Sequence, residues 1–275
     1  MEVERRSDKG SSEPRASGLG VGAAVAALGV GIATAALAAA LGSMLIGGSV
    51  PVLMLLVEVG LLVGAVVYLL ATRRRIAEAL RLGAAPARVY VVAVQLGLAL
   101  LVANLGATFL LGPPTYDFEL PAGSGGLWER LVFAVAVVMV APIAEESLFR
   151  GLLQGALESR MRAWLAIILA AVPFALLHGL QPAVFFLLWS LPVGWVAWRT
   201  GSIRPGIIIH AVNNLVGAIG LLVAGQVDRG SLEPDQGPAW FAAPLLALAA
   251  LWSVRLCRRI DRVIGGVETG SRDDT

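Results

Sequence analysis

Charged residues are scarce in this chain. Only 15% of the 275 residues are charged, whereas 57% are hydrophobic and the mean hydropathy is +0.80. A typical soluble domain has about 25% charged and about 45–50% apolar residues. The few charges gather in short breaks between long apolar runs. This composition argues against an ordinary soluble domain and predicts a multi-pass protein of the cell (plasma) membrane.

Other absences narrow the chemistry. Cys257 is the only cysteine, which excludes a disulfide framework and a cysteine-ligated zinc site within one chain. No basic stretch is interleaved with aromatic residues, so a nucleic-acid partner has no support. The sequence also lacks His-Glu-x-x-His, the pattern of soluble zinc proteases, and Gly-x-Ser-x-Gly, a pattern of serine hydrolases. Lysine is nearly absent and Ala, Gly and Val are abundant, which indicates a GC-rich bacterial genome.

Eight apolar runs, separated by short polar breaks, have lengths suited to crossing a bilayer. We place them at 19–46, 50–71, 89–112, 127–149, 163–180, 183–198, 205–225 and 238–257. The first run is too long for a cleavable signal peptide and is read as a retained span. Arginine-rich breaks alternate with arginine-poor ones, so the positive-inside rule places both termini in the cytoplasm. The predicted fold is all-α, a polytopic helical membrane bundle of about eight transmembrane helices.

Composition and motifs divide the chain into five segments. The polar residues 1–18 are expected to form a disordered cytoplasmic tail. N-terminal transmembrane helices follow over 19–126, and the residues that could carry chemistry lie in 127–225. A loop and the last transmembrane helix occupy 226–257, and 258–275 is expected to be a second cytoplasmic tail.

Two adjacent carboxylates and an arginine interrupt the fourth run, in the stretch APIAEESLFRG. Residues four apart on a helix are neighbours, whereas adjacent residues point in different directions. We therefore expect Glu146 and Arg150 to neutralise each other and Glu145 to remain a free carboxylate aimed into the bundle. The alternative is that both acids pair with Arg150 at the cytoplasmic interface and simply end the span.

The chain contains only two histidines, and each has a partner at helical spacing. His178 follows Phe174 by four residues, and His210 precedes Asn214 by four. Taken singly, such residues can be packed histidines or asparagines that bridge two helices. Together with Glu145 they are the ingredients of a His-His-Glu zinc site or of a glutamate base whose oxyanion is stabilised by histidines and an asparagine. Both arrangements hydrolyse an amide.

These residues resemble the CPBP intramembrane endopeptidases (the ABI family), which include the type II CAAX prenyl proteases. That family's pattern is Glu-Glu-x-x-x-Arg, then Phe-x-x-x-His, then His-x-x-x-Asn or Asp, on successive membrane helices. This chain has all three parts in order, starting at Glu145, Phe174 and His210. The resemblance covers roughly 127–225, and the first three spans carry no matching motif.

The resemblance implies a catalytic set made of Glu145, Glu146, Arg150, His178, His210 and Asn214. Glu145 would activate water, His178, His210 and Asn214 would bind a metal or the oxyanion, and Glu146 and Arg150 would support them. Any metal would be zinc, held by Glu145, His178 and His210; a metal-free glutamate mechanism is the other possibility. The substrate would be a membrane-associated peptide or protein within the lipid bilayer, and prenylated CAAX proteins are not expected in bacteria. The sequence leaves the oligomeric state open.

The catalytic hypothesis makes one demand on geometry. If the fourth span ended at Arg150, Glu145 would lie too near the cytoplasm to meet His178, so we expect this helix to continue to about residue 158.

Two other functions compete with catalysis. One is a non-catalytic binding, immunity or scaffold protein of the same fold, and the other is a proton-coupled transporter using Glu58, Glu145 and the histidines. Glu58 itself either pairs with a polar neighbour inside the bundle or lines the substrate cavity.

Overall fold

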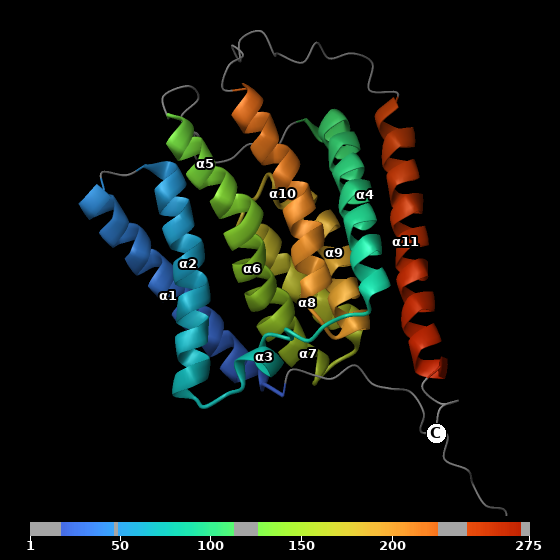
Figure 1. The fold of residues 1–275 in the computed structure, drawn as a ribbon, viewed down its shortest axis with the longest axis horizontal. Coiled ribbons are helices and arrows are strands. Elements are labelled where there is room, and N and C mark those ends of the chain that lie inside the picture. Colours follow the sequence, from blue (N-terminus) through green and yellow to red (C-terminus); the bar gives the residue numbers. More distant parts are fainter. Residues whose placement is uncertain (1–17, 47–48, 113–125, 225–240, 271–275) are drawn as a thin grey trace, which may run out of the picture.

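The computed structural model describes residues 18–46, 49–112, 126–224 and 241–270. Within these residues the regular structure is entirely helical (Figure 1). The α-helices are α1 (Val21–Ile46), α2 (Val50–Ala71), α3 (Ile76–Ala79), α4 (Ala87–Leu111), α5 (Leu127–Val135), α6 (Ala141–Glu145), α7 (Gly155–Glu158), α8 (Ala163–Leu176), α9 (Ala183–Thr200), α10 (Arg204–Ala224) and α11 (Ala242–Gly270). Two π-helical segments, η1 (Ala136–Val140) and η2 (Glu146–Gln154), join α5, α6 and α7 into one long helix. We call this helix, Leu127–Glu158, the composite helix.

Every predicted apolar run coincides with a helix, so the all-α prediction is confirmed. Five helices of the described residues are long and apolar enough to cross a membrane by length and composition, and α8 is a shorter apolar helix. The five are α1, α2, α4, the composite helix and α9. These apolar helices support a multi-pass membrane protein. Eight crossings and cytoplasmic termini stay predictions.

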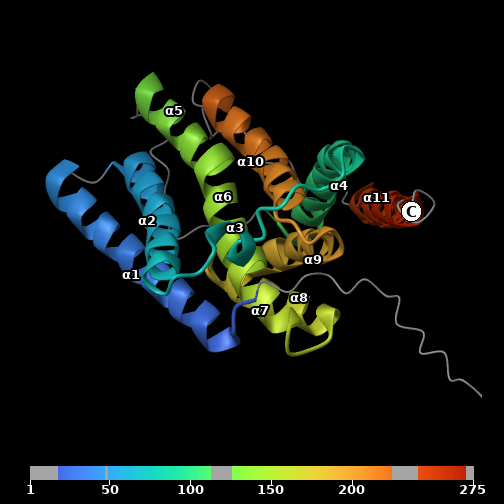
Figure 2. The ribbon, with the colours of Figure 1, turned by 60° about the horizontal axis from the view of Figure 1, so that its bottom comes forward.

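The helices form an extended bundle with the composite helix near its middle. Figure 1 shows α1 and α2 on one side, α4 and α11 on the other, and α8, α9 and α10 between them. In Figure 2 the same order is kept after the molecule is turned, and α11 remains outermost beside α4. The composite helix contacts α2 on one flank and α10 on the other. It therefore passes through the middle of the bundle, where its polar residues can meet those of α8 and α10.

Small residues bring α1 and α2 unusually close. A Cβ on Gly64 would lie 2.0 Å from the Thr34 Oγ1 atom, and one on Gly60 would lie 2.8 Å from the Ala35 Cα atom. The Thr34 hydroxyl donates to the Gly60 carbonyl at 2.7 Å. Close backbone approach with a polar contact is how helices associate in lipid, where burial of apolar side chains supplies little drive. This pair forms the wall behind one flank of the composite helix.

The composite helix extends well beyond Glu145 in both directions. It is continuous from Leu127 to Glu158, a length of 32 residues. At 1.5 Å per residue, Glu145 lies about 27 Å from one end and about 20 Å from the other. The expectation that this helix continues to about residue 158 is confirmed. The apolar core of a bilayer is about 30 Å thick, so distances of this size place Glu145 and Glu146 far from both helix ends on that scale.

A buried ion pair fixes the lower end of the composite helix. The Arg81 Nη1 atom lies 3.0 Å from the Glu158 Oε2 atom, and its Nη2 atom donates to the Ala197 carbonyl at 2.8 Å. The Gln154 amide donates to the Glu158 carboxylate and to the Gly194 carbonyl, each at 2.7 Å. These contacts tie the loop between α2 and α4 to the composite helix and to α9. We call Arg81, Gln154 and Glu158 the lower cluster.

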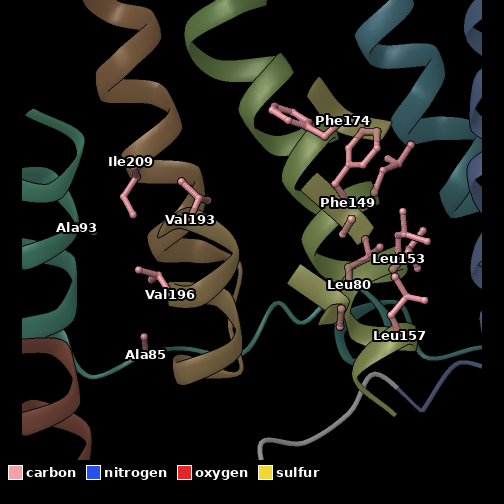
Figure 3. Packing of buried hydrophobic residues seen from close by; sticks show 14 of the residues in the cluster. Leu80, Ala85, Ala93, Phe149, Leu153, Leu157, Phe174, Val193, Val196 and Ile209 are labelled. Atoms are coloured by element: carbon pink, nitrogen blue, oxygen red, sulfur yellow. The ribbon is translucent and has the colours of Figure 1, made fainter. Parts of the chain in front are cut away.

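Apolar side chains fill the space between the lower cluster and the level of Glu145 and Glu146. Figure 3 shows Phe149, Leu153 and Leu157 of the composite helix packed near Leu80 and Phe174. On the far side of the same core, Val193 and Val196 of α9 face Ile209 of α10 and Ala93 of α4, and all are buried. The core thus holds α8, α9 and α10 at a fixed height against the composite helix.

Two helix ends differ from the predicted ones. α8 ends at Leu176 instead of 180, because the backbone turns at Gly179, whose φ of 102° suits only glycine. α11 continues to Gly270, well beyond 257, so much of the segment expected as a tail is helical. Residues 1–17 of the predicted N-terminal tail, and 225–240 of the predicted loop, lie outside the described residues.

Candidate functional site

Glu145, at the end of α6, faces both histidines. Its Oε1 atom lies 3.9 Å from the His178 Nε2 atom, and its Oε2 atom lies 3.6 Å from the His210 Nε2 atom. The Oε2 atom is buried and has no hydrogen-bond partner among the described residues. Both distances exceed that of a direct hydrogen bond, so the three side chains converge without bonding to one another. The structure thus brings together Glu145, His178 and His210, which lie 32 to 65 residues apart in the sequence, around a carboxylate oxygen that has no hydrogen-bond partner among the described residues.

The Nδ1 atom of each imidazole lies within hydrogen-bond distance of an oxygen acceptor. His178 Nδ1 lies 2.9 Å from the Phe174 carbonyl oxygen, and His210 Nδ1 lies 3.2 Å from the Glu146 Oε1 atom. A carbonyl or an ionised carboxylate can only accept, so Nδ1 must carry the proton in both rings. In the neutral imidazoles the Nε2 lone pairs then point toward Glu145. They can accept a hydrogen from water or bind a cation, whereas donation to an oxyanion would require a second proton on the ring.

Glu146 and Arg150 form the buried pair that the spacing predicts. The Arg150 Nη1 atom donates to the Glu146 Oε1 atom at 2.9 Å, and both side chains are almost fully buried. The Arg150 Nη2 atom donates to the Ser190 hydroxyl at 2.7 Å. The guanidinium carbon also lies 4.3 Å from the centre of the Phe174 ring, a cation–π contact. Arg150 is therefore committed to structural partners, which leaves Glu145 free of it.

Aromatic rings of α9 fix the orientation of both imidazoles. The Phe186 ring stacks on His178 with the centroids 3.7 Å apart, and the Trp189 ring meets His210 edge-on at 4.5 Å. Together with Ser190, these residues place α9 against the site, a role that the sequence analysis missed. In the sequence they look like ordinary members of an apolar run. The only available signal was Ser190, an isolated hydroxyl within that run.

Asn214 lies on the same face of α10 as His210 but contacts the backbone of the composite helix. Its amide nitrogen donates to the Val137 carbonyl at 2.7 Å. That carbonyl has lost its usual partners, since the Ala141 N–H donates to Ala136 and the next residue, Pro142, has no N–H. Asn214 thus replaces the hydrogen bond that the proline removes. Among the described contacts this is a bridging role, and none supports the metal or oxyanion role implied by the family resemblance.

Glu58 of α2 is a third carboxylate near the site, after Glu145 and Glu146. α2 packs against α6, and Glu58 lies close enough to interact electrostatically with Glu145. Its Oε2 atom is buried and has no hydrogen-bond partner among the described residues. We considered that Glu58 either pairs with a polar neighbour or lines the substrate cavity. Its Oε2 atom does not show the first of these roles. The acidic character of the site comes from α2 as well as from the composite helix.

The donor set has some of the features of a zinc site. Two imidazole Nε2 atoms and a carboxylate converge, and each Nδ1–H is held by an oxygen, as in histidines that bind metals. However, no group of three or more His, Cys, Asp or Glu side chains within the described residues is arranged to hold a metal ion. Ligand atoms around tetrahedral zinc lie about 3.4 Å apart, closer than the nitrogen–oxygen distances found here. The chemistry of the donors suits zinc, and their spacing is about 0.2 to 0.5 Å wider than a bound zinc ion would hold them.

Residues 127–216 match the model of a protein family described as type II CAAX prenyl endopeptidase Rce1-like. The match confirms the family resemblance. It covers the composite helix, α8, α9 and the part of α10 that carries His210 and Asn214. No curated protein and no solved structure shows significant similarity to the chain. The description of that family names an endopeptidase, which is a hydrolase that acts on a peptide or protein substrate.

Proposed function

We propose that this protein is an intramembrane endopeptidase in which Glu145 is the general base. The observation that carries the proposal is the placement of the Glu145 carboxylate between two Nε2 atoms at 3.9 and 3.6 Å. A water held there could donate one hydrogen to Glu145 and the other to an imidazole, which aligns the oxygen lone pair toward a substrate carbonyl. His178 and His210 then act as acceptors that orient the water.

The chemistry follows from that placement. Glu145 takes a proton from the water as its oxygen forms a bond to the carbonyl carbon of the scissile amide. The protonated Glu145 then delivers this proton to the amide nitrogen as the carbon–nitrogen bond breaks. The products are a carboxylic acid and an amine, the second water proton passes from this acid to the amine to give a carboxylate and an ammonium, and Glu145 returns to its initial state. A general base of this kind contributes about 10²–10⁴-fold to the rate.

Glu146 and Arg150 are positioning residues in this proposal. The Glu146 carboxylate holds the Nδ1–H of His210 and is itself neutralised by Arg150. The Glu146 carboxylate packs closely against α10, because a Cβ on Gly206 would lie 2.9 Å from the Glu146 Oε2 atom. Loss of either partner would leave a buried charge unpaired and would release the His210 ring. We expect such a loss to reduce both stability and activity.

Zinc remains an alternative at the same residues. Bound by Glu145, His178 and His210, it would supply a Lewis acid for the substrate carbonyl. Metal analysis of the purified wild-type protein and of a His178→Ala, His210→Ala double variant distinguishes the two mechanisms. Stoichiometric zinc that is lost in the double variant would favour the metal mechanism, and a metal-free, active wild type would favour the glutamate mechanism.

The experiment for the proposed function compares wild type with Glu145→Gln in their own membranes, because the substrate is not identified. Profiling of new protein termini should reveal cleavage products that appear with wild type and are absent with Glu145→Gln. The matched control is Glu129→Gln, the same chemical change in the first turn of the same helix, where Glu129 accepts a hydrogen bond from Ser49. Products that persist with Glu145→Gln would contradict the proposal.

A purified assay then tests the substrate class. Wild type in liposomes is given a farnesylated C-terminal Cys-a-a-X peptide and a membrane-anchored peptide without a lipid. We propose a membrane-associated peptide substrate, so cleavage of the unprenylated peptide is expected. Cleavage confined to the farnesylated peptide would instead assign the CAAX specificity of the family description to this chain.

A further inference from the structure

An apolar groove lies between α8, α9 and α11, on the opposite side of α9 from the candidate site. Its volume is about 470 Å³, within the range of about 300–1,000 Å³ found for ligand sites. The indole rings of Trp164 and Trp195 and the side chain of Val254 contribute to its lining. Trp164 and Val254 are 58% and 48% exposed, so the groove is open toward the surroundings of the bundle. In a multi-pass membrane protein those surroundings are lipid.

The same groove contains one uncompensated cation. Arg258 and Asp261 of α11 both line it. Asp261 accepts a hydrogen bond from the Arg199 Nε atom at 2.5 Å and is thus neutralised by α9. No hydrogen bond or ion pair joins the exposed Arg258 guanidinium to another described residue. A groove with apolar walls therefore carries a free positive charge.

The position of this charge fits the headgroup level of one leaflet. Trp164 is the second residue of α8, and Arg199 is the second-last residue of α9, so this part of the groove lies at the helix ends near the arginine-rich breaks. The positive-inside rule places those breaks in the cytoplasm. Tryptophan is enriched at such interfaces, and the cytoplasmic leaflet attracts basic residues through its anionic lipids. The groove would thus meet lipid headgroups at its charged end and acyl chains along its apolar walls.

We propose that this groove is a binding site for an anionic phospholipid. The phosphate lies at Arg258, and an acyl chain lies against Trp164, Trp195 and Val254. The argument is charge complementarity together with an apolar channel, and it does not depend on the proposed protease activity. On α9 the groove is lined by Leu191, Pro192 and Trp195, and the same helix carries Ser190 and Trp189, which contact Arg150 and His210. Bound lipid would therefore stabilise the helix that orients the candidate site.

The chain contains its own probe for this site, because its only cysteine, Cys257, lines the groove. The full-length protein is reconstituted into nanodiscs of phosphatidylglycerol or of phosphatidylcholine with the same acyl chains. The rate of Cys257 labelling by an uncharged maleimide is then measured in each. We expect labelling to be several-fold slower in phosphatidylglycerol, because only the anionic lipid is held at Arg258. Equal rates in the two lipids would overturn the proposal.

Two variants make the test specific. Arg258→Gln should label equally fast in both lipids, whereas the matched control Arg255→Gln, an exposed arginine of the same helix outside the groove lining, should retain the difference. Protection that persists in Arg258→Gln, or that is lost in Arg255→Gln, would contradict binding at Arg258. Val254→Trp should fill the apolar part of the groove, where the acyl chain would lie. It should therefore also reduce the difference in Cys257 labelling rate between the two lipids.

Thermal unfolding gives a second readout that does not use the cysteine. Added phosphatidylglycerol should raise the unfolding temperature of detergent-solubilised wild type by about 3 °C or more relative to phosphatidylcholine. Arg258→Gln should remove this difference without changing the unfolding temperature in phosphatidylcholine. Identical shifts in wild type and Arg258→Gln would show that the lipid acts elsewhere and would sink the proposed site.

Discussion

The composite helix carries acidic side chains at two levels, and the carboxylates at these two levels have different partners. At the lower cluster, the Glu158 carboxylate has an ion pair with Arg81 and a hydrogen bond from Gln154. At the upper level, Glu146 is paired with Arg150 in the same way, but Glu145 has, among the described residues, only the two imidazole Nε2 atoms near it, at 3.6 and 3.9 Å. The upper level therefore keeps one carboxylate without a direct partner, whereas the lower level does not.

The difference shows which level can do chemistry. A buried polar group that is fully paired adds rigidity, whereas an unpaired one costs free energy, a cost that is typical of functional sites. The lower cluster joins the loop between α2 and α4 to α9, which is a structural duty. The upper level leaves Glu145 Oε2 and two imidazole lone pairs around a common space. We therefore expect substitutions at the two levels to separate activity from stability.

The largest expected effect is loss of cleavage in Glu145→Gln. Removing the base should lower the rate by about 10²–10⁴-fold. The unfolding temperature should stay near that of wild type, because Glu145 makes no hydrogen bond that the amide would lose at its Oε2 atom. Cleavage rates and thermal unfolding on the same preparations check both halves of the prediction. A Glu145→Gln protein that is unstable would remove the contrast between the two levels.

Glu146→Gln should affect both properties. It leaves the buried Arg150 guanidinium without its counter-charge, which costs about 3–5 kcal/mol in systems where a buried ion pair is broken. It also loosens the Nδ1 contact that orients His210. Unfolding in a denaturant titration and the rate of cleavage by the folded fraction measure the two effects. Wild-type stability in this variant would show that Ser190 and the aromatic rings alone satisfy Arg150.

Arg81→Gln tests the lower cluster by the same logic. It leaves Glu158 buried without a cation, so we expect a loss of about 3 kcal/mol in stability. The rate per folded molecule should change little, because Arg81 has no contact with Glu145 or the histidines among the described residues. The control is Arg75→Gln in the same loop, whose pair with Glu78 is exposed and should not affect the unfolding temperature. A large fall in the rate per folded molecule would link the two levels.

The smallest effect is expected for Asn214 and is best measured as a double-mutant cycle. Asn214→Leu leaves the Val137 carbonyl without a donor, at a cost of about 1–2 kcal/mol. Pro142→Ala restores a backbone N–H that can serve this carbonyl, so the cost of Asn214→Leu should shrink in that background. Equal costs in both backgrounds would mean that the bridge does not compensate for the proline. Rates measured on the same four proteins would reveal any further role of Asn214 in catalysis.

Helix spacing within the sequence predicted the local part of the site. Glu146 and Arg150 are four residues apart, so their pairing follows from the geometry of a single helix. The length of the composite helix was also predictable, because the site could form only if the chain remained helical beyond Arg150. Ser190, Phe186 and Trp189 were not predictable, since their contacts depend on how α9 is rotated against α8 and α10.

The sequence by itself determined the helices, the family resemblance and the residues with unusual polarity, because these depend on composition and on spacing within one helix. The tertiary structure alone decided that Glu158 is paired with Arg81, 77 residues away, and that the nearest nitrogens to the Glu145 carboxylate are those of two histidines from α8 and α10. It also turned the Asn214 amide toward the carbonyl freed by Pro142. These outcomes depend on contacts between helices that are distant in the chain, and no spacing within a single helix encodes them.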